Sequence, residues 1–184
     1  SACTSVSLNW AISLALGGTL AGAPAVAQEP ADGWRIRLDA SSAGLVDKGR
    51  LTLGSGSGAA SGLDAFDTPH PPALPSRHLD VYTEHQQVEP GWAGQLRPLT
   101  RYHREFVPAL GVADWAVEFT VATDQANDVT LAWTLTEDLD LASHFLALRD
   151  LESGSVVDPR SLGAYIFSPT SANRTFRLEM TAGR

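Results

Sequence analysis

Cysteine and lysine are almost missing from this chain of 184 residues. The one cysteine, Cys3, lies in an N-terminal segment that we expect to be removed, so the mature chain is expected to hold no disulfide, iron–sulfur site or thiol nucleophile. The thirteen basic residues include one lysine, Lys48, and the formal net charge is −8. A chain that neutralises phosphates needs a basic face, so we expect no nucleic-acid partner.

Long hydrophobic runs are missing as well. Residues 1–27 carry no charge, their apolar run from Trp10 to Leu16 is short, and Ala25-Val26-Ala27 fits the small-x-small pattern of signal peptidase. We interpret residues 1–27 as a signal peptide truncated at its start, because an initiating Met and a basic n-region are missing, and residues 28–184 as a single domain. We therefore expect the chain not to be transmembrane after signal cleavage, with a retained anchor as the alternative.

Strict alternation of apolar and polar residues is the main pattern that is present. Trp115, Val117, Phe119 and Val121 alternate with polar or small residues, and the pattern returns from Val129 to Leu135. A period of two indicates strands with one buried face, and the polar connection between the two segments predicts a β-hairpin over 114–135. A two-stranded ribbon cannot bury its own tryptophans, so the remaining chain has to supply a second sheet.

Shorter alternating segments recur along the rest of residues 28–184. They lie at 33–39, 50–54, 78–84, 146–150, 156–158, 164–167 and 175–180, and a polar, arginine-rich segment at 100–106 is expected to be an exposed edge strand. No long helical pattern occurs. The fold class that we predict is all-β: a two-sheet antiparallel β-sandwich, immunoglobulin-like or jelly-roll-like, of about nine strands.

The glycine- and proline-rich segment from Gly54 to Ser76 is predicted to be a long loop. Asp64 and Asp67 lie three residues apart in it, and two carboxylates with backbone carbonyls suit the all-oxygen shell of Ca²⁺. The alternative is that each aspartate caps a turn by accepting backbone N–H groups. A calcium site at Asp64 and Asp67 is therefore one hypothesis, and no other cofactor is expected.

Three further sets of residues carry hypotheses. Trp92, between two glycines, is the tryptophan expected to be exposed and able to stack on a sugar, whereas the strand tryptophans are expected in the core. Glu84, Glu118 and Glu137 are the carboxylates from which a glycosidase pair would be drawn, although a solvated outer face explains them adequately. A buried salt-bridged corner is expected to contain three residues of the late hairpin: Asp150, Asp158 and Arg160.

The order of several short motifs resembles an uncharacterised β-sandwich module of large secreted and cell-surface bacterial proteins, where it sits beside dockerins, immunoglobulin-like repeats or sorting domains of the gliding-type secretion system. The motifs that carry the resemblance are Trp34-x-Ile36-x-Leu38, Gly62-Leu63-Asp64, Asp67-x-Pro69-x-Pro71-Pro72, Trp115-x-Val117-x-Phe119, Val129-x-Leu131-x-Trp133, Leu148-x-Asp150, Val157-Asp158-x-Arg160, Tyr165-x-Phe167 and Arg174-x-Phe176-x-Leu178. The resemblance implies a bacterial accessory module, secreted, periplasmic or on the cell surface, with no catalytic residues to transfer.

These observations favour a non-catalytic, secreted module for extracellular binding or scaffolding. An extracellular polysaccharide or a surface protein is the expected partner, and the sheet edges offer surfaces for strand addition. A carbohydrate-binding domain or a sugar-acting hydrolase is the first alternative. The second is a structural subunit of a surface filament or envelope complex, which would show as self-association.

Overall fold

The structure is a computed structural model that describes residues 29–30, 32–45, 49–70, 78–86, 100–108, 114–124, 126–136 and 144–182. These residues form eleven strands and no helix, which confirms the all-β class. The strands are β1 (Arg35–Ser42), β2 (Gly49–Gly56), β3 (Thr68–Pro69), β4 (Leu79–Glu84), β5 (Arg101–Pro108), β6 (Trp115–Thr123), β7 (Val129–Leu135), β8 (His144–Asp150), β9 (Val156–Val157), β10 (Ala164–Phe167) and β11 (Asn173–Ala182).

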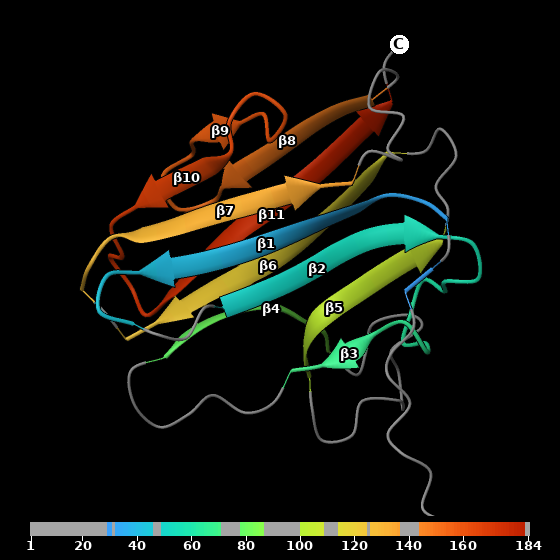
Figure 1. Cartoon of the computed structure of the whole chain (residues 1–184), viewed down its shortest axis with the longest axis horizontal. Coiled ribbons are helices and arrows are strands. Elements are labelled where there is room, and N and C mark those ends of the chain that lie inside the picture. The colour runs from blue at the N-terminus through green and yellow to red at the C-terminus, as the bar shows by residue number, and fades with distance from the viewer. Residues whose placement is uncertain are drawn as a thin grey trace, which may run out of the picture.

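The strands lie in one mixed sheet of order β10-β7-β1-β2-β5-β4-β6-β11-β8-β9, and β3 pairs with β5 beside this path (Figure 1). The expectation of a wholly antiparallel arrangement is wrong at one place, because β2 and β5 run parallel. Parallel neighbours need a long crossover connection. The chain between β2 and β5 provides it, since it includes β3 and β4.

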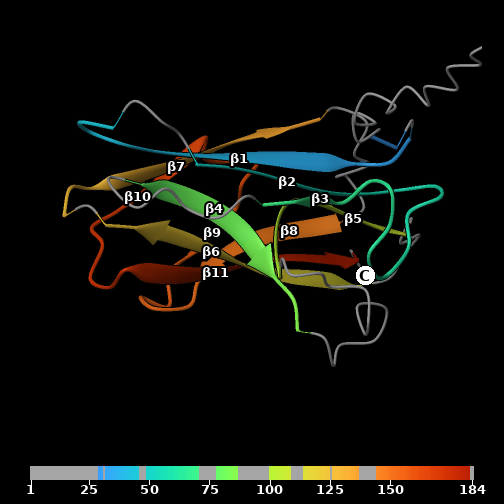
Figure 2. The same cartoon turned by 90° about the horizontal axis from the view of Figure 1, so that it is seen from below.

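The sheet curls over on itself, so that β1, β2 and β7 lie in one layer and β6, β8 and β11 in the other (Figure 2). Two separate sheets are not confirmed, because β4 belongs to both layers. Leu79–Tyr82 pair with β6, while Thr83 and Glu84 pair with β5. The twist of each strand accumulates across the sheet and brings its two ends, β9 and β10, back towards one another.

The hairpin predicted over 114–135 is wrong, although both of its strands exist. Strand β6 pairs with β4 and β11, whereas β7 pairs with β1 and β10. The connection at 124–128 therefore passes from one layer to the other instead of turning within a sheet. Alternation predicts that a strand has one buried face, but it does not predict which strand lies beside it. The late hairpin is confirmed, since β8 and β9 pair antiparallel.

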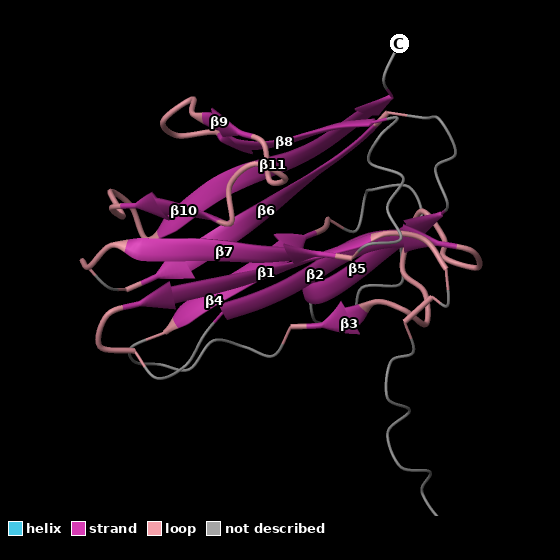
Figure 3. Ribbon diagram, turned by 45° about the horizontal axis from the view of Figure 1, so that its top comes forward, coloured by secondary structure: helices cyan, strands magenta, loops and turns pink. Residues whose placement is uncertain are grey.

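Strand β5 has β2 on one side and β3 on the other in Figure 3, and it also pairs with the end of β4, so the edge position predicted for 100–106 is also wrong. Its charged residues are tolerated there because they have partners. Arg101 faces Glu84, and Glu105 lies against His85. Among the described residues, the path of the sheet ends at β9 and β10.

The core fills the space between the two layers and supports the tryptophan prediction. Trp34 packs edge-on against Trp115, with ring centroids 4.9 Å apart, and the indole N–H of Trp133 donates to the carbonyl of Pro159 at 2.7 Å. Phe119 on β6 stacks on Phe176 of β11. The other fully buried apolar residues include Ile36, Leu38, Ala40, Leu51, Leu53, Val81, Val129, Leu131 and Leu178.

Candidate functional site

A fork in the sheet, where β4 leaves β6, is the feature that we take as the candidate site. Strand β4 pairs with β6 from Leu79 to Tyr82, then turns towards β5. Beyond Thr120 no described residue pairs with β6 on the β4 side, although β11 pairs with it as far as Trp115. In Figure 2 β4 crosses obliquely between the two layers. Among the described residues, the divergence leaves the exposed positions Ala116 and Glu118 of β6 without a paired strand on this side.

The fork opens into a groove with a volume of about 500 Å³. Its described walls are mostly polar. Phe119 also borders the groove, but its side chain is buried in the core. The walls offer two carboxylates, an amide, an imidazole and three hydroxyls, a set that binds by hydrogen bonds and by attraction of cations. The described residues that line the groove are Glu84, His85, Gln86, Thr100, Glu118, Phe119, Thr120 and Thr175.

The two carboxylates of the groove retain capacity to accept hydrogen bonds. Glu84 Oε1 lies 3.5 Å from Arg101 Nε, and Glu118 Oε1 lies 4.0 Å from Arg177 Nε. Both separations are long for a charge-assisted hydrogen bond, which is usually shorter than 3 Å. About half of each glutamate side chain is exposed, 50% for Glu84 and 56% for Glu118. The groove therefore presents two half-exposed carboxylates to a ligand, each in a long ion pair that leaves part of its accepting capacity unused.

A histidine–glutamate pair forms one side of the groove. His85 Nε2 lies 3.0 Å from Glu105 Oε2, and the His85 ring packs edge-on against Tyr102. Glu105 faces the interior because it lies opposite Leu53 in the parallel pair, and only 7% of its surface is exposed. The pair brings a ring nitrogen that lines the groove against a buried carboxylate behind it.

A second buried carboxylate, Asp67, lies close to this pair. Its Oδ1 accepts the N–H of Phe106 at 3.1 Å, and its Oδ2 accepts the N–H of Asp64 at 2.9 Å. Burial raises the pKa of Asp67 to about 7; the two N–H groups oppose this rise, and the negative charges of Asp64 and Glu105 add to it. Burial also raises the pKa of Tyr102, with Asp67 and Glu105 contributing. A strongly shifted carboxyl beside charged neighbours is typical of functional sites, although structural networks show it as well.

The loop that carries Asp64 and Asp67 is held by these aspartates. Asp64 Oδ2 accepts the N–H of Ala60 and its Oδ1 accepts the N–H of Phe66, at 2.6 and 2.7 Å. Each of the four carboxylate oxygens therefore accepts a backbone N–H, the arrangement of turn caps. No cluster of three or more His, Cys, Asp or Glu suited to a metal occurs in the described part of the chain. These hydrogen bonds favour the turn-capping alternative, and the calcium site at Asp64 and Asp67 stays a hypothesis for a titration to test.

The other predicted site residues divide into two groups. The fork brings Glu84 and Glu118 to the same groove. Trp92 and Glu137 lie outside the described residues, as does the end of the predicted loop at 71–76. Sequence reasoning missed His85, Glu105 and Thr175. No spacing links these three residues in the sequence, because the curled sheet brings them together from the end of β4, from β5 and from β11.

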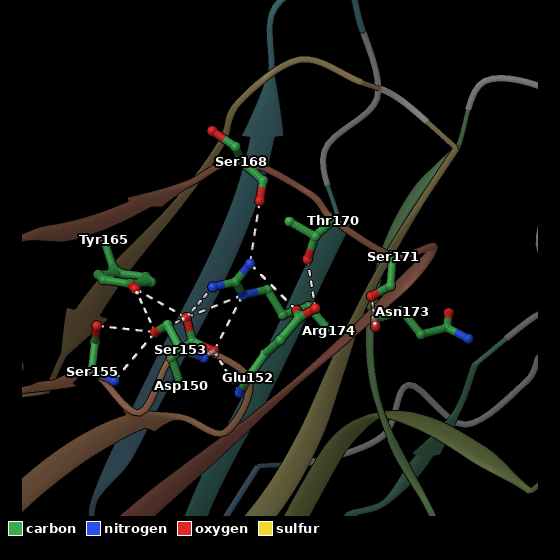
Figure 4. A network of polar contacts seen from close by, with 10 residues as sticks. All are labelled: Asp150, Glu152, Ser153, Ser155, Tyr165, Ser168, Thr170, Ser171, Asn173 and Arg174. Atoms are coloured by element: carbon green, nitrogen blue, oxygen red, sulfur yellow. Dashed lines mark hydrogen bonds and ion pairs between the residues drawn. The ribbon is translucent and has the colours of Figure 1, made fainter.

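The predicted corner of Asp150, Asp158 and Arg160 is wrong in its pairing. Asp158 pairs with Arg160 at the surface, while Asp150 pairs with Arg174, which donates to both of its oxygens (Figure 4). Burial alone raises the pKa of Asp150, but hydrogen bonds from Arg174, Ser153 and Tyr165 outweigh it and hold the pKa at about 2.

This polar network ties together strands from both ends of the sheet. Tyr165 on β10 donates its O–H to Asp150 on β8 at 3.0 Å, and Arg174 on β11 donates to the carbonyl of Ser168 just beyond β10. Figure 4 shows the guanidinium of Arg174 between these acceptors. The network spans the line where the sheet ends approach, so we assign it to stability and not to ligand binding.

Comparison with known proteins finds no protein family, no curated protein and no solved structure that matches this chain. The resemblance to a bacterial cell-surface module therefore stays a prediction. Within the residues that the structure describes, no helix is both long and apolar enough to cross a membrane.

Proposed function

We propose that this chain is a non-catalytic binding module that holds an extended ligand in the groove at the fork between β4 and β6. The observation that carries the proposal is the groove itself, an open site of about 500 Å³ with two half-exposed carboxylates and several hydroxyls in its walls. Such a wall suits a ligand that supplies donors along its length. The uncharged segment at 1–27 supports an exported protein, and we propose an extracellular or periplasmic bacterial setting.

The facing layers also support the proposal that the folded-over sheet acts as a two-layer β-sandwich of immunoglobulin-like or jelly-roll-like type. In that arrangement the core is made by the inner faces, and the outer faces and edges are left for contacts. Glu118, Thr120 and Thr175 belong to positions that alternate with the buried residues Phe119, Val121 and Phe176. A ligand in the groove would therefore contact the protein without disturbing its core.

The test is thermal unfolding of the chain with a panel of polysaccharides and of extended peptides. A ligand at a hundredfold above its dissociation constant adds about 2.7 kcal/mol to the free energy of unfolding, enough to raise the melting temperature by several degrees. Glu118→Gln and Thr175→Val should each reduce the shift. Glu179→Gln is the matched control, because Glu179 lies further along β11 and outside the groove.

Two other results would replace the proposal. A shift that survives both groove variants would place the ligand elsewhere on the molecule. No shift with any ligand, together with self-association in sedimentation, would favour the structural subunit of a filament or envelope complex.

A sugar-acting hydrolase is the second candidate, favoured by the presence of Glu84 and Glu118 in one groove. Glycosidases use two carboxyl groups on either side of the scissile bond, one as acid and the other as base or nucleophile. Release of reducing ends from a polysaccharide by the chain, abolished by Glu84→Gln and by Glu118→Gln, would establish this activity. Binding without release of reducing ends would leave the binding module as the function.

A further inference from the structure

One hydrogen bond at the end of β6 shows which residues of this strand direct their backbone N–H and C=O groups towards β11. The N–H of Thr123 donates to the carbonyl of Ala172, just before β11, at 2.9 Å. Successive residues of an antiparallel strand present their N–H and C=O groups alternately to one neighbour and to the other. The backbone N–H and C=O groups of Val117 and Phe119 therefore point to β11, while those of Ala116 and Glu118 point to the fork.

These fork-facing groups form a short open edge. Thr120 and Ala122 are the next residues whose backbone groups point to this side of β6, and they pair with Tyr82 and Asp80 of β4. Had β4 continued, it would have paired with Glu118 and Ala116, but it turns away to β5 at Thr83. No described strand takes its place. An open edge of this kind is a template for an added strand.

The two faces of the open edge differ in character. Trp115 and Val117 lie on the inner face, partly buried against the core, while Glu118 on the outer face is half exposed. A strand added beside β6 would place alternate side chains on these two faces. Those on the inner face would cover Trp115 and Val117, and those on the outer face would meet the carboxylates of Glu118 and Glu84.

We propose that the ligand of the groove is an extended peptide segment of alternating apolar and basic residues, which adds as a strand to the open edge of β6 at Ala116 and Glu118. This inference rests on the proposed function and names its ligand class. Main-chain hydrogen bonds hold the segment, and its arginines or lysines approach the exposed sides of Glu84 and Glu118, whose own ion pairs with Arg101 and Arg177 are long. The edge of β6 favours a peptide over a polysaccharide, because a strand supplies main-chain groups that can pair with those of Ala116 and Glu118.

The experiment is a fluorescence-anisotropy titration of the full chain with a capped, labelled octapeptide in which lysine alternates with valine and threonine. A peptide of the same pattern with glutamate in place of lysine is the charge control, and it should bind at least tenfold more weakly. Glu118→Gln should weaken binding of the lysine peptide several-fold and reduce its dependence on salt, because one charge pair is lost.

The decisive variant is Ala116→Pro. Proline removes the N–H that faces the fork, and an outward-facing N–H on an open edge is a position where a strand accepts proline. We expect the melting temperature to change by a few degrees at most and the peptide affinity to fall by about tenfold. Val117→Pro is the directional control. It removes an N–H that points to β11, so it should lower the melting temperature strongly.

A ligand-side variant keeps the test independent of the folding of Ala116→Pro. N-methylation of alternate residues in the octapeptide removes its donors in one of two registers, and one register should lose binding while the other keeps it. Equal binding by both methylated peptides and by Ala116→Pro would overturn strand addition. A polysaccharide that binds and depends on Thr175 but not on Ala116 would keep the proposed function and reject the peptide, and absence of any groove ligand would reject both.

Discussion

Arg174 and Asp150 form a bidentate pair across two neighbouring strands, in which the guanidinium Nε lies 3.2 and 3.1 Å from the two carboxylate oxygens. Both side chains are buried, at 8% and 2% exposure. The same arginine lies over the ring of Phe167, 4.7 Å from its centroid. Removal of one partner from such a pair leaves a buried charge without compensation, which costs more than the pair contributes while it is intact.

Arg174→Met should therefore destabilise the protein by about 3–5 kcal/mol, as measured by chemical denaturation at pH 7. Arg160→Ala is the matched control, because Arg160 and Asp158 form an ion pair that is partly exposed, at 31% and 40%. Exposed pairs contribute little, so the control should lose less than about 1 kcal/mol. Equal losses in the two variants would contradict the assignment of Asp150 to Arg174.

The loss of stability at acid pH should depend on the same pair of Arg174 and Asp150. The pKa of Asp150 is about 2 in the folded protein, below its ordinary value of 3.8. A lowered pKa stabilises the fold fully above pH 4 and loses that contribution as the pH falls through 2, a loss of about 2 kcal/mol. Denaturant unfolding between pH 2 and pH 5 should show a shallower dependence in Arg174→Met. A dependence as steep as that of the unmodified chain would place the acid-sensitive group elsewhere.

The decline in stability as the pH rises from 4 to 7 should depend on Asp67, whose pKa is raised and not lowered. Burial raises the pKa of Asp67 to about 7, so its neutral form is favoured in the folded state. This contribution is complete below pH 4 and is lost as the pH rises through 7, by about 4 kcal/mol at most. Asp67→Asn should be less stable at pH 5, because one backbone N–H loses its acceptor, and should show a flatter decline up to pH 8.

The control for that experiment is Asp64→Asn in the same loop. Asp64 is more exposed than Asp67 and accepts two backbone N–H groups of its own. The variant should lose stability at pH 5 and should flatten the decline less than Asp67→Asn does, because it removes only the smaller contribution of the Asp64 charge to the raised pKa of Asp67. A decline between pH 5 and pH 8 that persists in Asp67→Asn would show that another group controls it.

Alternation in the sequence predicts strands well here because it reports burial, which is a local property. Ile36, Leu38 and Phe119 are buried where the pattern placed them. Strand order is not local, because it depends on which faces meet after the sheet curls. This is why the order failed for β6 and β7, which have the expected alternation and yet lie in opposite layers.

The candidate site was predictable only in part, for the same physical reason. Glu84 and Glu118 were identified as strand carboxylates, but their shared groove depends on the departure of β4 from β6. Glu105 was assigned to an exposed edge because it stands among arginines in the sequence. Its burial follows from the pairing of β5 with β2, and the sequences of these two segments contain no signal that predicts this pairing.

The loop of Asp64 and Asp67 provides a last prediction, on calcium. A calcium ion needs six to eight oxygen ligands, and carboxylates must turn towards it to supply them. In this loop each of the four oxygens accepts a backbone N–H, so binding would require the loop to give up these hydrogen bonds. We expect millimolar calcium and a chelator to leave the melting temperature unchanged, and calorimetry to detect no binding. A calcium-dependent rise that Asp64→Asn abolishes would show instead that the loop rearranges into a metal site, and the same rise in both Asp64→Asn and the unmodified chain would place the ion outside this loop.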